Sequence, residues 1–380
     1  MSTYIAYVKI LEVIKIIGAD AVSRRLHHFL PGCRILQLTK EAAGKINNTY
    51  KICTADGIYM LQEISRTMFG ENVPGLESNY REFLKAYDQY EQCGRQPAFV
   101  VPRWLPDGEG KLIYTDEQQR HWRVYRYLSG EPLSGVEVPN KTELFAKAVV
   151  FMHFLLSQVS ADMQEVIAHY HEIRYYADAF AAVEAVNGRD RECERMIADE
   201  LPFILGHCVF EKNAVIHGDT KIGNILYDGK TGQISFIDLD TFCYSSKLID
   251  IGDSVRSLAY RKRDAVGCLL QAAEHGACSP LLYGKEGCGS GSCFDWSLCR
   301  DFLNAYIASP LCRLNQEEIS RLPYAAMRIP FELGLRYYTD YLMGNLYFTT
   351  ADPKRNLVRA KEQFRLYREI CQGDLGSLKQ

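Results

Sequence analysis

The stretch that decides the fold is His217-Gly218-Asp219-Thr220-Lys221-Ile222-Gly223-Asn224-Ile225-Leu226-Tyr227, followed after a turn by Ile234-Ser235-Phe236-Ile237-Asp238-Leu239-Asp240. Asp228 and Gly229 between the two runs are typical turn residues. The pattern predicts a polar loop that leads into a β-hairpin near 225–238, whose second strand ends in two carboxylates. Because a tight hairpin brings its two ends together, Asp219, Asn224 and Asp238 are expected to lie around one point.

These three side chains match the needs of phosphoryl transfer. One carboxylate can accept the proton of an attacking hydroxyl, and hard oxygen ligands can hold Mg²⁺ against nucleotide phosphates. In the catalytic loop of protein kinases the base Asp precedes a metal-binding Asn by five positions, and Asp219 precedes Asn224 by five. Asp238 has the position of the second metal ligand. The alternative is that all three only cap turns, and their shared order and spacing favour a site.

The block resembles the aminoglycoside phosphotransferase and choline kinase superfamily, whose members carry H-G-D-x-x-x-x-N followed by a D-x-D-like element. Within that superfamily, the similarity to bacterial N-acetylhexosamine 1-kinases is closer, and it extends over residues 36–370. Three further segments carry the resemblance: Asn47-Asn48-Thr49-Tyr50 with Tyr59-Met60-Leu61-Gln62, then Trp122-Arg123-Val124-Tyr125-Arg126-Tyr127, and finally Gly334 to Phe348.

The resemblance implies an α+β, bilobal protein-kinase-like fold and transfer of the γ-phosphate of ATP, with Mg²⁺, to the anomeric hydroxyl of N-acetylglucosamine or N-acetylgalactosamine. By the same resemblance, Asp219 matches the catalytic base beside the substrate, Asn224 and Asp238 match metal ligands, and Arg336 and Tyr347 line the sugar site. A kinase of choline, a pentose or an aminoglycoside is the alternative enzyme. An inactive binding scaffold is disfavoured because Asp219, Asn224 and Asp238 are all present.

Residues 40–50 lie between the first two predicted strands, where kinases place the loop that covers the phosphates. Position and resemblance predict nucleotide contacts from Gly44, Lys45, Asn47, Asn48 and Thr49, and from backbone groups of Arg126, Tyr127 and Leu128 at the hinge. Gln62 stands where kinases usually place a Lys or Arg on the third strand. The residue that neutralises the phosphates is therefore open, with Lys45 as a candidate. Glu82 on the following helix is either the usual acidic partner or a solvated charge.

Strand patterns cover 34–38, 49–54, 58–64, 98–102, 111–115 and 121–128, with Asp56-Gly57 as a hairpin turn. Helical patterns cover 3–30, 77–92 and 141–157, and much of 160–215 and 296–380. The order predicts an antiparallel nucleotide-binding lobe over 1–128, with the helix 77–92 before the fourth strand. A hinge near 126–131 precedes a helical lobe over 129–380 that carries the catalytic loop and the substrate site.

Several other polar residues have two interpretations. His169 and His171 lie in a helical stretch and are either surface histidines or substrate contacts. Asp250, Gly252 and Asp253 follow the metal strand and are expected to organise the site without touching substrate. Arg336 is four residues before Asp340, so a salt bridge on one helix face is the alternative to a sugar contact.

The composition excludes some classes of partner. The formal net charge of −3 does not favour nucleic acid. Lys9, Glu12 and Lys15 interrupt the apolar N-terminal stretch, which predicts an amphipathic helix and a cytoplasmic protein with no membrane partner. The sequence leaves open the hexosamine epimer, the nucleoside triphosphate, and whether the protein is a monomer or a dimer.

The chain has 13 cysteines, and its densest group is Cys278, Cys288, Cys293 and Cys299. This group contains no C-x-x-C pair, which favours reduced thiols over a zinc site. Residues 287–291 are rich in glycine, but no strand leads into them. They predict a flexible surface loop and not a phosphate-binding loop.

Overall fold

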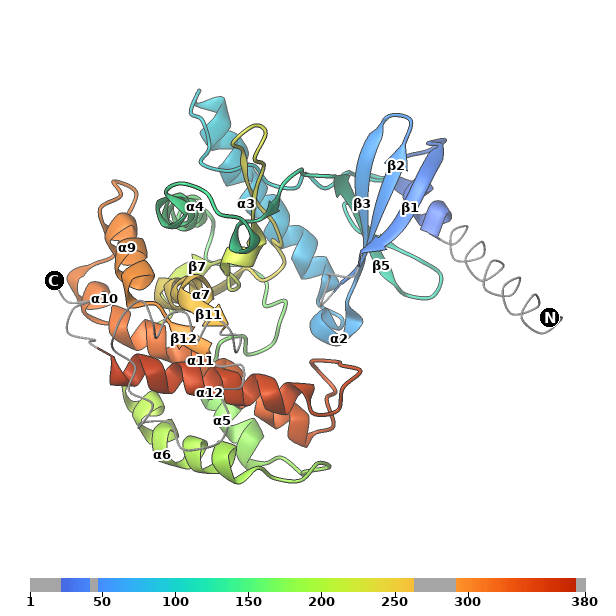
Figure 1. The fold of residues 1–380 in the computed structure, drawn as a ribbon. Coiled ribbons are helices and arrows are strands. Elements are labelled where there is room, and N and C mark those ends of the chain that lie inside the picture. The colour runs from blue at the N-terminus through green and yellow to red at the C-terminus, as the bar shows by residue number, and fades with distance from the viewer. Residues whose placement is uncertain (1–21, 42–46, 263–291, 374–380) are drawn as a thin grey trace.

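The computed structural model describes residues 22–41, 47–262 and 292–373. Figure 1 shows an antiparallel sheet at one end of the molecule and a larger group of helices at the other. This arrangement confirms the predicted α+β class. The N-terminal helix is confirmed over residues 22–29. Its earlier part, Cys278, Cys288 and the loop 287–291 lie outside the described residues.

The N-terminal sheet has five antiparallel strands in the order β1-β2-β3-β5-β4. They are β1 (Ile35–Glu41), β2 (Asn48–Thr54), β3 (Gly57–Ile64), β4 (Tyr114–Thr115) and β5 (His121–Arg126). The hairpin between β2 and β3 turns at residues 55–56, and Gly57 supplies the positive φ of 149° that follows the turn.

The strand predicted at 98–102 is wrong. Val100 makes one isolated parallel bridge with Ser235 and is not part of the five-stranded sheet. Its N–H donates to the Ile234 carbonyl and its carbonyl accepts from the Phe236 N–H, so this segment runs along the hairpin of the C-terminal part. Pro102, which has no N–H, cannot extend the ladder.

Strand alternation gives the sheet two different faces. One face packs with the helix at 22–29 in a small core of Val22, Leu26, Phe29, Ile52, Tyr59, Leu61, Trp122 and Val124. The other face carries Thr49, Lys51, Met60, Gln62, Arg123 and Tyr125, and all six line a cavity. The sheet therefore places a mixed polar and apolar surface toward the helical part of the molecule.

The helices are α2 (Arg66–Phe69), α3 (Val73–Gln92), α4 (Lys141–Leu156), α5 (Ile173–Ala181), α6 (Arg191–His207), α7 (Lys247–Ala259), α9 (Trp296–Ile307), α10 (Gln316–Ser320), α11 (Leu322–Leu342) and α12 (Arg355–Gln372). The short strands are β6 (Glu131–Pro132), β7 (Ala214–Ile216), β8 (Ile225–Tyr227), β9 (Ile234–Phe236), β10 (Cys243–Ser245), β11 (Tyr260–Lys262) and β12 (Ser292–Phe294). The predicted hairpin is β8–β9, which is confirmed. The pairs β7–β10 and β11–β12 were not predicted, because strands of three residues are too short for a periodic pattern.

Helix α3 packs with the helical part and not under the sheet. It begins after Asn72 with Pro74 in its first turn, and it buries Leu76, Tyr80 and Phe83 in the large core. Glu82 lies on its outer face, where it pairs with Lys85. Of the two alternatives for Glu82, the solvated charge is the one that the structure supports.

Helices α7 and α11 cross at Gly252, and this crossing positions the acidic residues of α7. The α7 cap is Ser246, whose hydroxyl accepts from the Leu248 N–H. A Cβ added at Gly252 would lie 2.3 Å from the Ala325 carbonyl oxygen of α11. Because backbone atoms cannot move aside as a flexible side chain can, the close packing requires glycine at this position.

We expect Gly252→Ala to lower the free energy of unfolding by about 1–3 kcal/mol, because an added methyl group forces the two helices apart. Thermal or urea unfolding measures the change. Gly206→Ala in α6 is the matched control, because a Cβ there meets no atom within 4 Å. That variant should be as stable as the parent or more stable by about 0.4–1 kcal/mol. An equally stable Gly252→Ala protein would contradict the proposed packing constraint.

Candidate active site

The loop after β7 is held in place by a buried carboxylate on α7. The Asp250 oxygens accept from the backbone N–H groups of His217 and Gly218, both at 2.8 Å, and from His153 Nε2 at 3.0 Å. Burial raises the pKa of Asp250, but the hydrogen bond and charge of His153 more than offset this and leave the pKa below its usual value. Asp250 therefore organises the loop from behind, as expected from the sequence.

Steric constraints explain why the second residue of the H-G-D motif is glycine. Gly218 has a φ of +83°, and a Cβ there would lie 2.6 Å from the Thr241 carbonyl oxygen. The neighbouring His217 ring lies 4.8 Å from the Phe236 ring, between centroids, and burial lowers its pKa. Its Nδ1 accepts from the Asp219 N–H at 3.2 Å, so the ring shapes the turn that presents Asp219.

Asp219 and Asn224 lie together, as the spacing predicted. The Asn224 Nδ2 donates to the Asp219 carbonyl at 2.9 Å and to its Oδ2 at 3.2 Å. Lys221, which the sequence analysis did not single out, donates from Nζ to the same carboxylate. Burial raises the pKa of Asp219, but the charge and hydrogen bond of Lys221, together with His217 and the hydrogen bond from Asn224, outweigh burial and hold the pKa below its usual value. An ionised carboxylate of this kind can accept a proton.

Asp238 follows β9 in a left-handed conformation, with a φ of 64°. The Ile237 N–H donates to the Asn224 carbonyl at 2.9 Å and ties this end of the hairpin to its start. The Asp238 carboxylate has no hydrogen-bond partner in the described part of the chain. Burial, with the nearby charges of Asp240 and Asp219, raises its pKa to about 6 against the opposing charge of Lys221. A partly buried carboxylate that makes no ion pair and lines the same cavity as Asn224 fits a hard divalent metal ion.

A cavity of about 490 Å³ lies between the sheet and the β8–β9 hairpin. Lys221, Asn224 and Asp238 line one side of it. Its apolar lining includes Met60, Tyr125, Tyr127, Leu128, Leu226 and Leu239. The combination of an apolar part near residues 127–128 and a polar part near Asp238 suits a ligand with a flat ring and an anionic tail.

The predicted nucleotide residues differ in where their side chains lie. Asn47 and Thr49 line the cavity, and Asn47 Nδ2 donates to Asp240 at 3.0 Å. Asn48 is exposed and donates to Glu63 at 3.1 Å. The guanidinium of Arg126 lies 5.6 Å from the centroid of the Tyr59 ring, outside the cavity lining. Gly44 and Lys45 lie outside the described residues.

The hinge residues Tyr127 and Leu128 both line the cavity. The Tyr127 N–H donates to the Ile58 carbonyl at 2.9 Å, so this donor is already used within the protein. Lys51 places its Nζ 3.9 Å from the centroid of the Tyr127 ring. The backbone groups that remain for a ring-shaped ligand at the hinge are therefore the carbonyl of Tyr127 and the groups of Leu128.

Arg123 is a second cavity residue that the sequence analysis did not single out. It pairs with Gln62 across β5 and β3, and its Nε donates to Gln62 Oε1 at 2.9 Å. Gln62 in turn donates to Thr49 Oγ1 at 3.1 Å. Arg123 also forms an ion pair with Asp240, and both side chains are almost completely buried, 3% and 2% exposed.

A second cluster surrounds Arg336 on α11. Its guanidinium lies over four aromatic rings, with Cζ 4.9–5.7 Å from their centroids; the rings belong to Tyr170, Tyr176, Tyr347 and Phe348. One Arg336 nitrogen lies 3.5 Å from the Tyr347 hydroxyl, and another lies 3.6 Å from Glu332. The two predicted sugar residues therefore lie in contact with each other.

The salt bridge between Arg336 and Asp340 is not formed. Asp340 instead accepts from the N–H groups of Tyr347 at 2.7 Å and Phe348 at 2.9 Å. Asn356 Nδ2 donates to the same carboxylate at 3.0 Å. Asp340 thus fixes the segment after α11 so that Tyr347 turns back toward Arg336.

Tyr170 and His171 connect this cluster to the loop after β7. The Tyr170 hydroxyl donates to the Gly218 carbonyl at 3.0 Å, and His171 Nε2 lies 2.8 Å from the same oxygen. His171 Nδ1 lies 2.9 Å from Glu332. The helix predicted around His169 and His171 is wrong, because both residues have positive φ values, 55° and 60°, in the turn before α5.

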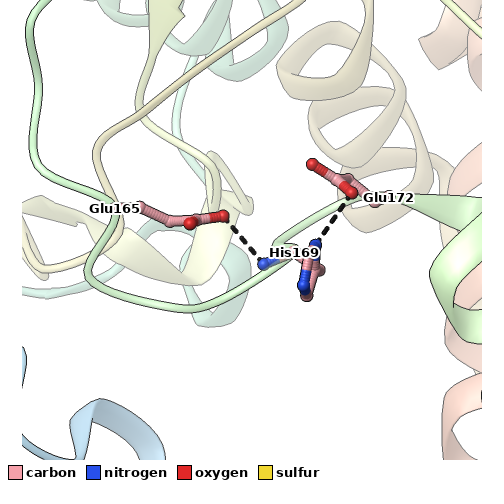
Figure 2. Close-up of side chains that lie close together, drawn as sticks. All are labelled: Glu165, His169 and Glu172. Carbon is pink, nitrogen blue, oxygen red and sulfur yellow. Dashed lines mark hydrogen bonds and ion pairs between the residues drawn. The ribbon is translucent and has the colours of Figure 1, made fainter.

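Figure 2 shows the one group among the described residues whose carboxylate and imidazole ligand atoms lie close enough to share a metal ion, Glu165, His169 and Glu172. Glu165 accepts from the His169 N–H at 2.9 Å, and His169 Nδ1 lies 3.0 Å from Glu172. Lys212 pairs with Glu172. These contacts close an exposed turn, in agreement with the surface interpretation of His169.

A sheet beside a helical part, with a carboxylate-bearing hairpin at their junction, defines the class as a kinase-like phosphotransferase fold. A profile of the phosphotransferase enzyme family matches residues 40–286, which include Asp219, Asn224 and Asp238. The chain belongs to this family, and it is a phosphotransferase with a small-molecule kinase fold.

Solved structures share this fold. The chain is similar to the amicoumacin kinase hAmiN, solved with AMP-PNP, Ca²⁺ and Ami, at a TM-score of 0.58 and 16% identity over 96% of this chain and 99% of that one. It is similar to a microcompartment-associated aminopropanol kinase at a TM-score of 0.57 and 15% identity, over 95% of this chain and 98% of that one. It is also similar to an aminoglycoside phosphotransferase from Alicyclobacillus acidocaldarius at a TM-score of 0.55 and 15% identity, over 95% of each chain. These matches confirm the predicted fold.

A membrane-spanning segment is absent from the described helices, none of which is both long enough and apolar enough to cross a bilayer.

Proposed function

We propose that the protein is an ATP- and Mg²⁺-dependent kinase that transfers the γ-phosphate to the anomeric hydroxyl of an N-acetylhexosamine, either N-acetylglucosamine or N-acetylgalactosamine. The observation that carries the kinase assignment is the meeting of an ionised Asp219 and an unpaired Asp238 beside a cavity with an apolar end. Adenine would lie near residues 126–128, and the phosphates would point toward Asp238.

In this proposal Asp219 accepts the proton of the sugar hydroxyl at its carboxylate as the oxygen attacks the γ-phosphorus. The bond from that phosphorus to the bridging oxygen breaks, and ADP leaves. Asn224 and Asp238 would hold Mg²⁺, which would supply positive charge to offset that of the nucleotide phosphates. Lys221 lies against Asp219 and within the cavity lining, so its ammonium can attract the transferred phosphoryl group.

The nucleotide contacts are proposed from the loop residues Gly44, Lys45, Asn47, Asn48 and Thr49 and from Arg126, Tyr127 and Leu128. Asn47, Thr49, Tyr127 and Leu128 support this proposal by lining the cavity. The structurally similar amicoumacin kinase hAmiN was solved with AMP-PNP and Ca²⁺, a nucleotide and a divalent metal ion on the same fold.

A neutral sugar suits the cluster around Arg336 better than a cationic substrate does. Four aromatic rings could form a cage for a quaternary or primary amine, but the guanidinium of Arg336 already lies over them. A second cation brought beside Arg336 would be repelled. An Arg and a Tyr hydroxyl instead offer hydrogen bonds to ring hydroxyls and to an acetamide group.

The direct test is ADP release from ATP across a panel of N-acetylhexosamines, pentoses, choline and aminoglycosides. We expect turnover with an N-acetylhexosamine and none with choline. Turnover with choline or an aminoglycoside alone would replace the sugar assignment with the alternative kinase.

Removal of the metal ligand has a separate expected result. Asp238→Ala should abolish Mg²⁺-dependent binding of ADP, because it removes a carboxylate in the cavity lining that is not engaged in an ion pair and can bind a hard metal ion. Calorimetric titration with ADP, with and without Mg²⁺, measures the loss. The control is Asp228→Asn in the hairpin turn, where Asp228 caps the Lys230 N–H at 2.8 Å. Full turnover of the parent enzyme in excess chelator would contradict the metal assignment.

A further inference from the structure

The cavity has no cation on β3, where Gln62 stands, but Arg123 lines it from the neighbouring strand β5. Thr49, Gln62 and Arg123 form a row across β2, β3 and β5, because Thr49 pairs with Gln62 and Gln62 pairs with Arg123 in the sheet register. All three side chains line the cavity. Among the three, Arg123 alone carries charge.

We propose that Arg123 presents positive charge to the nucleotide phosphates from the sheet, and that Gln62 and Asp240 hold its guanidinium in the orientation this requires. The proposal rests on the kinase function proposed above. In this proposal β5 supplies the phosphate-facing cation that β3 lacks, and Gln62 is a positioning residue.

The guanidinium is fixed on three sides. Its Nε and Nη2 donate to Gln62 Oε1 at 2.9 and 2.7 Å, and Nη1 and Nη2 donate to the two oxygens of Asp240. Its Cζ lies 4.4 Å from the centroid of the Trp104 ring. A guanidinium has five N–H donors, and these contacts use four of them, which leaves one on Nη1 for a ligand.

The position along the cavity also fits the phosphates. The row Lys51, Met60 and Tyr125 lies at the hinge end, two residues away along each strand. The row that contains Arg123 lies at the opposite end, where it joins Asp240, two residues after Asp238. A nucleotide with its base near Tyr127 and its phosphates toward Asp238 would pass Lys51 first and Arg123 next.

The other cations of the cavity have different positions. Lys51 lies against the Tyr127 ring at the hinge, and Lys221 pairs with Asp219 on the acceptor side. Arg123 lies in the sheet beside Gln62 and is buried with Asp240. Burial lowers the pKa of Arg123, but Asp240 outweighs burial and raises it, so the charge is permanent.

A simple replacement of Arg123 would leave Asp240 buried without its cation, and such a variant can lose stability for that reason alone. The test therefore compares two proteins in which Asp240 is already neutral, Asp240→Asn and Asp240→Asn/Arg123→Gln. These two differ only at residue 123, where glutamine removes the guanidinium with its charge and its donors. Binding of ADP and of adenosine, both measured by calorimetry, reports phosphate and base contacts separately.

We expect the double variant to bind ADP about 10- to 100-fold more weakly than Asp240→Asn, as the loss of a hydrogen bond to a charged group predicts. Adenosine affinity should be equal in the two proteins, because adenosine has no phosphates. Adding Gln62→Lys to the double variant should recover ADP affinity, since it restores a cation in the same row. Arg103→Gln is the surface control, because Arg103 pairs with Asp88 and Glu91 on the outside.

Equal ADP affinity in Asp240→Asn and the double variant would overturn the role of Arg123, as would an equal loss of adenosine and ADP. The failure of the kinase proposal looks different. In that case the parent protein itself would bind no ADP in the presence of Mg²⁺.

Discussion

Asp219→Asn should lower kcat by about 10²–10⁴-fold, the usual contribution of a general base. The carboxylate is ionised and lies against Lys221 and Asn224, so the proton of an acceptor hydroxyl has a base within the loop. Asparagine has the same shape but cannot take that proton. Because Asp250 holds the loop backbone independently, ADP affinity and the melting temperature should stay close to those of the parent.

The matched control for this variant is Asp228→Asn, the same chemical change within the same hairpin. Asp228 is partly exposed in the turn, where it accepts from Ser129 and from the Lys230 N–H. Steady-state turnover of this control should equal that of the parent. A kcat for Asp219→Asn within a few-fold of the parent would show that another group acts as the base.

The catalytic loop could be predicted because its residues are neighbours in the sequence. Asp219 and Asn224 are five residues apart, and the β8–β9 hairpin returns the chain from Asn224 to Asp238. Their spacing in the sequence is therefore enough to predict that they lie close together. Lys221 lies inside the same motif, so its contact with Asp219 could have been predicted from the same spacing.

Arg123 required information that the sequence analysis did not use. Trp122 to Tyr127 were predicted as a strand, and strand alternation places Arg123 on the same face as Tyr125. Only the register between β3 and β5, however, brings Arg123 beside Gln62. Register depends on tertiary packing, so no local sequence pattern predicts that Thr49, Gln62 and Arg123 lie side by side.

The surroundings of Arg336 were even harder to predict from the sequence. Glu332 lies four residues earlier on α11, a spacing as favourable for a salt bridge as that of Asp340. The choice between them depends on Asp340 binding the backbone of residues 347–348. Tyr170 comes from a turn with left-handed residues on both sides, which a helical pattern could not predict.

Arg336→Ala should reduce kcat/KM for the sugar by at least about 100-fold, because two hydrogen bonds from a charged donor are each worth about 1.5–3 kcal/mol. Affinity for ADP should not change, since Arg336 does not line the nucleotide cavity. The fold should also remain, because Glu332 keeps its ion pairs with Arg328 and His171 when Arg336 is removed.

The matched control is Arg189→Ala, another arginine near an aromatic ring, with its Cζ 6.0 Å from the Phe180 centroid and its nitrogen paired with Glu194. It is about half exposed and should leave sugar turnover unchanged. If Arg336→Ala keeps the sugar kcat/KM of the parent, Arg336 only balances the charge of Glu332 inside α11.

The product decides which hydroxyl accepts the phosphate. Phosphorus NMR of a reaction with N-acetylglucosamine or N-acetylgalactosamine should show an anomeric phosphate. A site built from the donors of Arg336 and the hydroxyl of Tyr347 should also reject sugars that lack the acetamide group, because its own polar groups would then be unpaired. A 6-phosphate, or no product from any N-acetylhexosamine, would contradict transfer to the anomeric oxygen. The kinase assignment itself depends on Asp219 and Asp238 and would stand after either result.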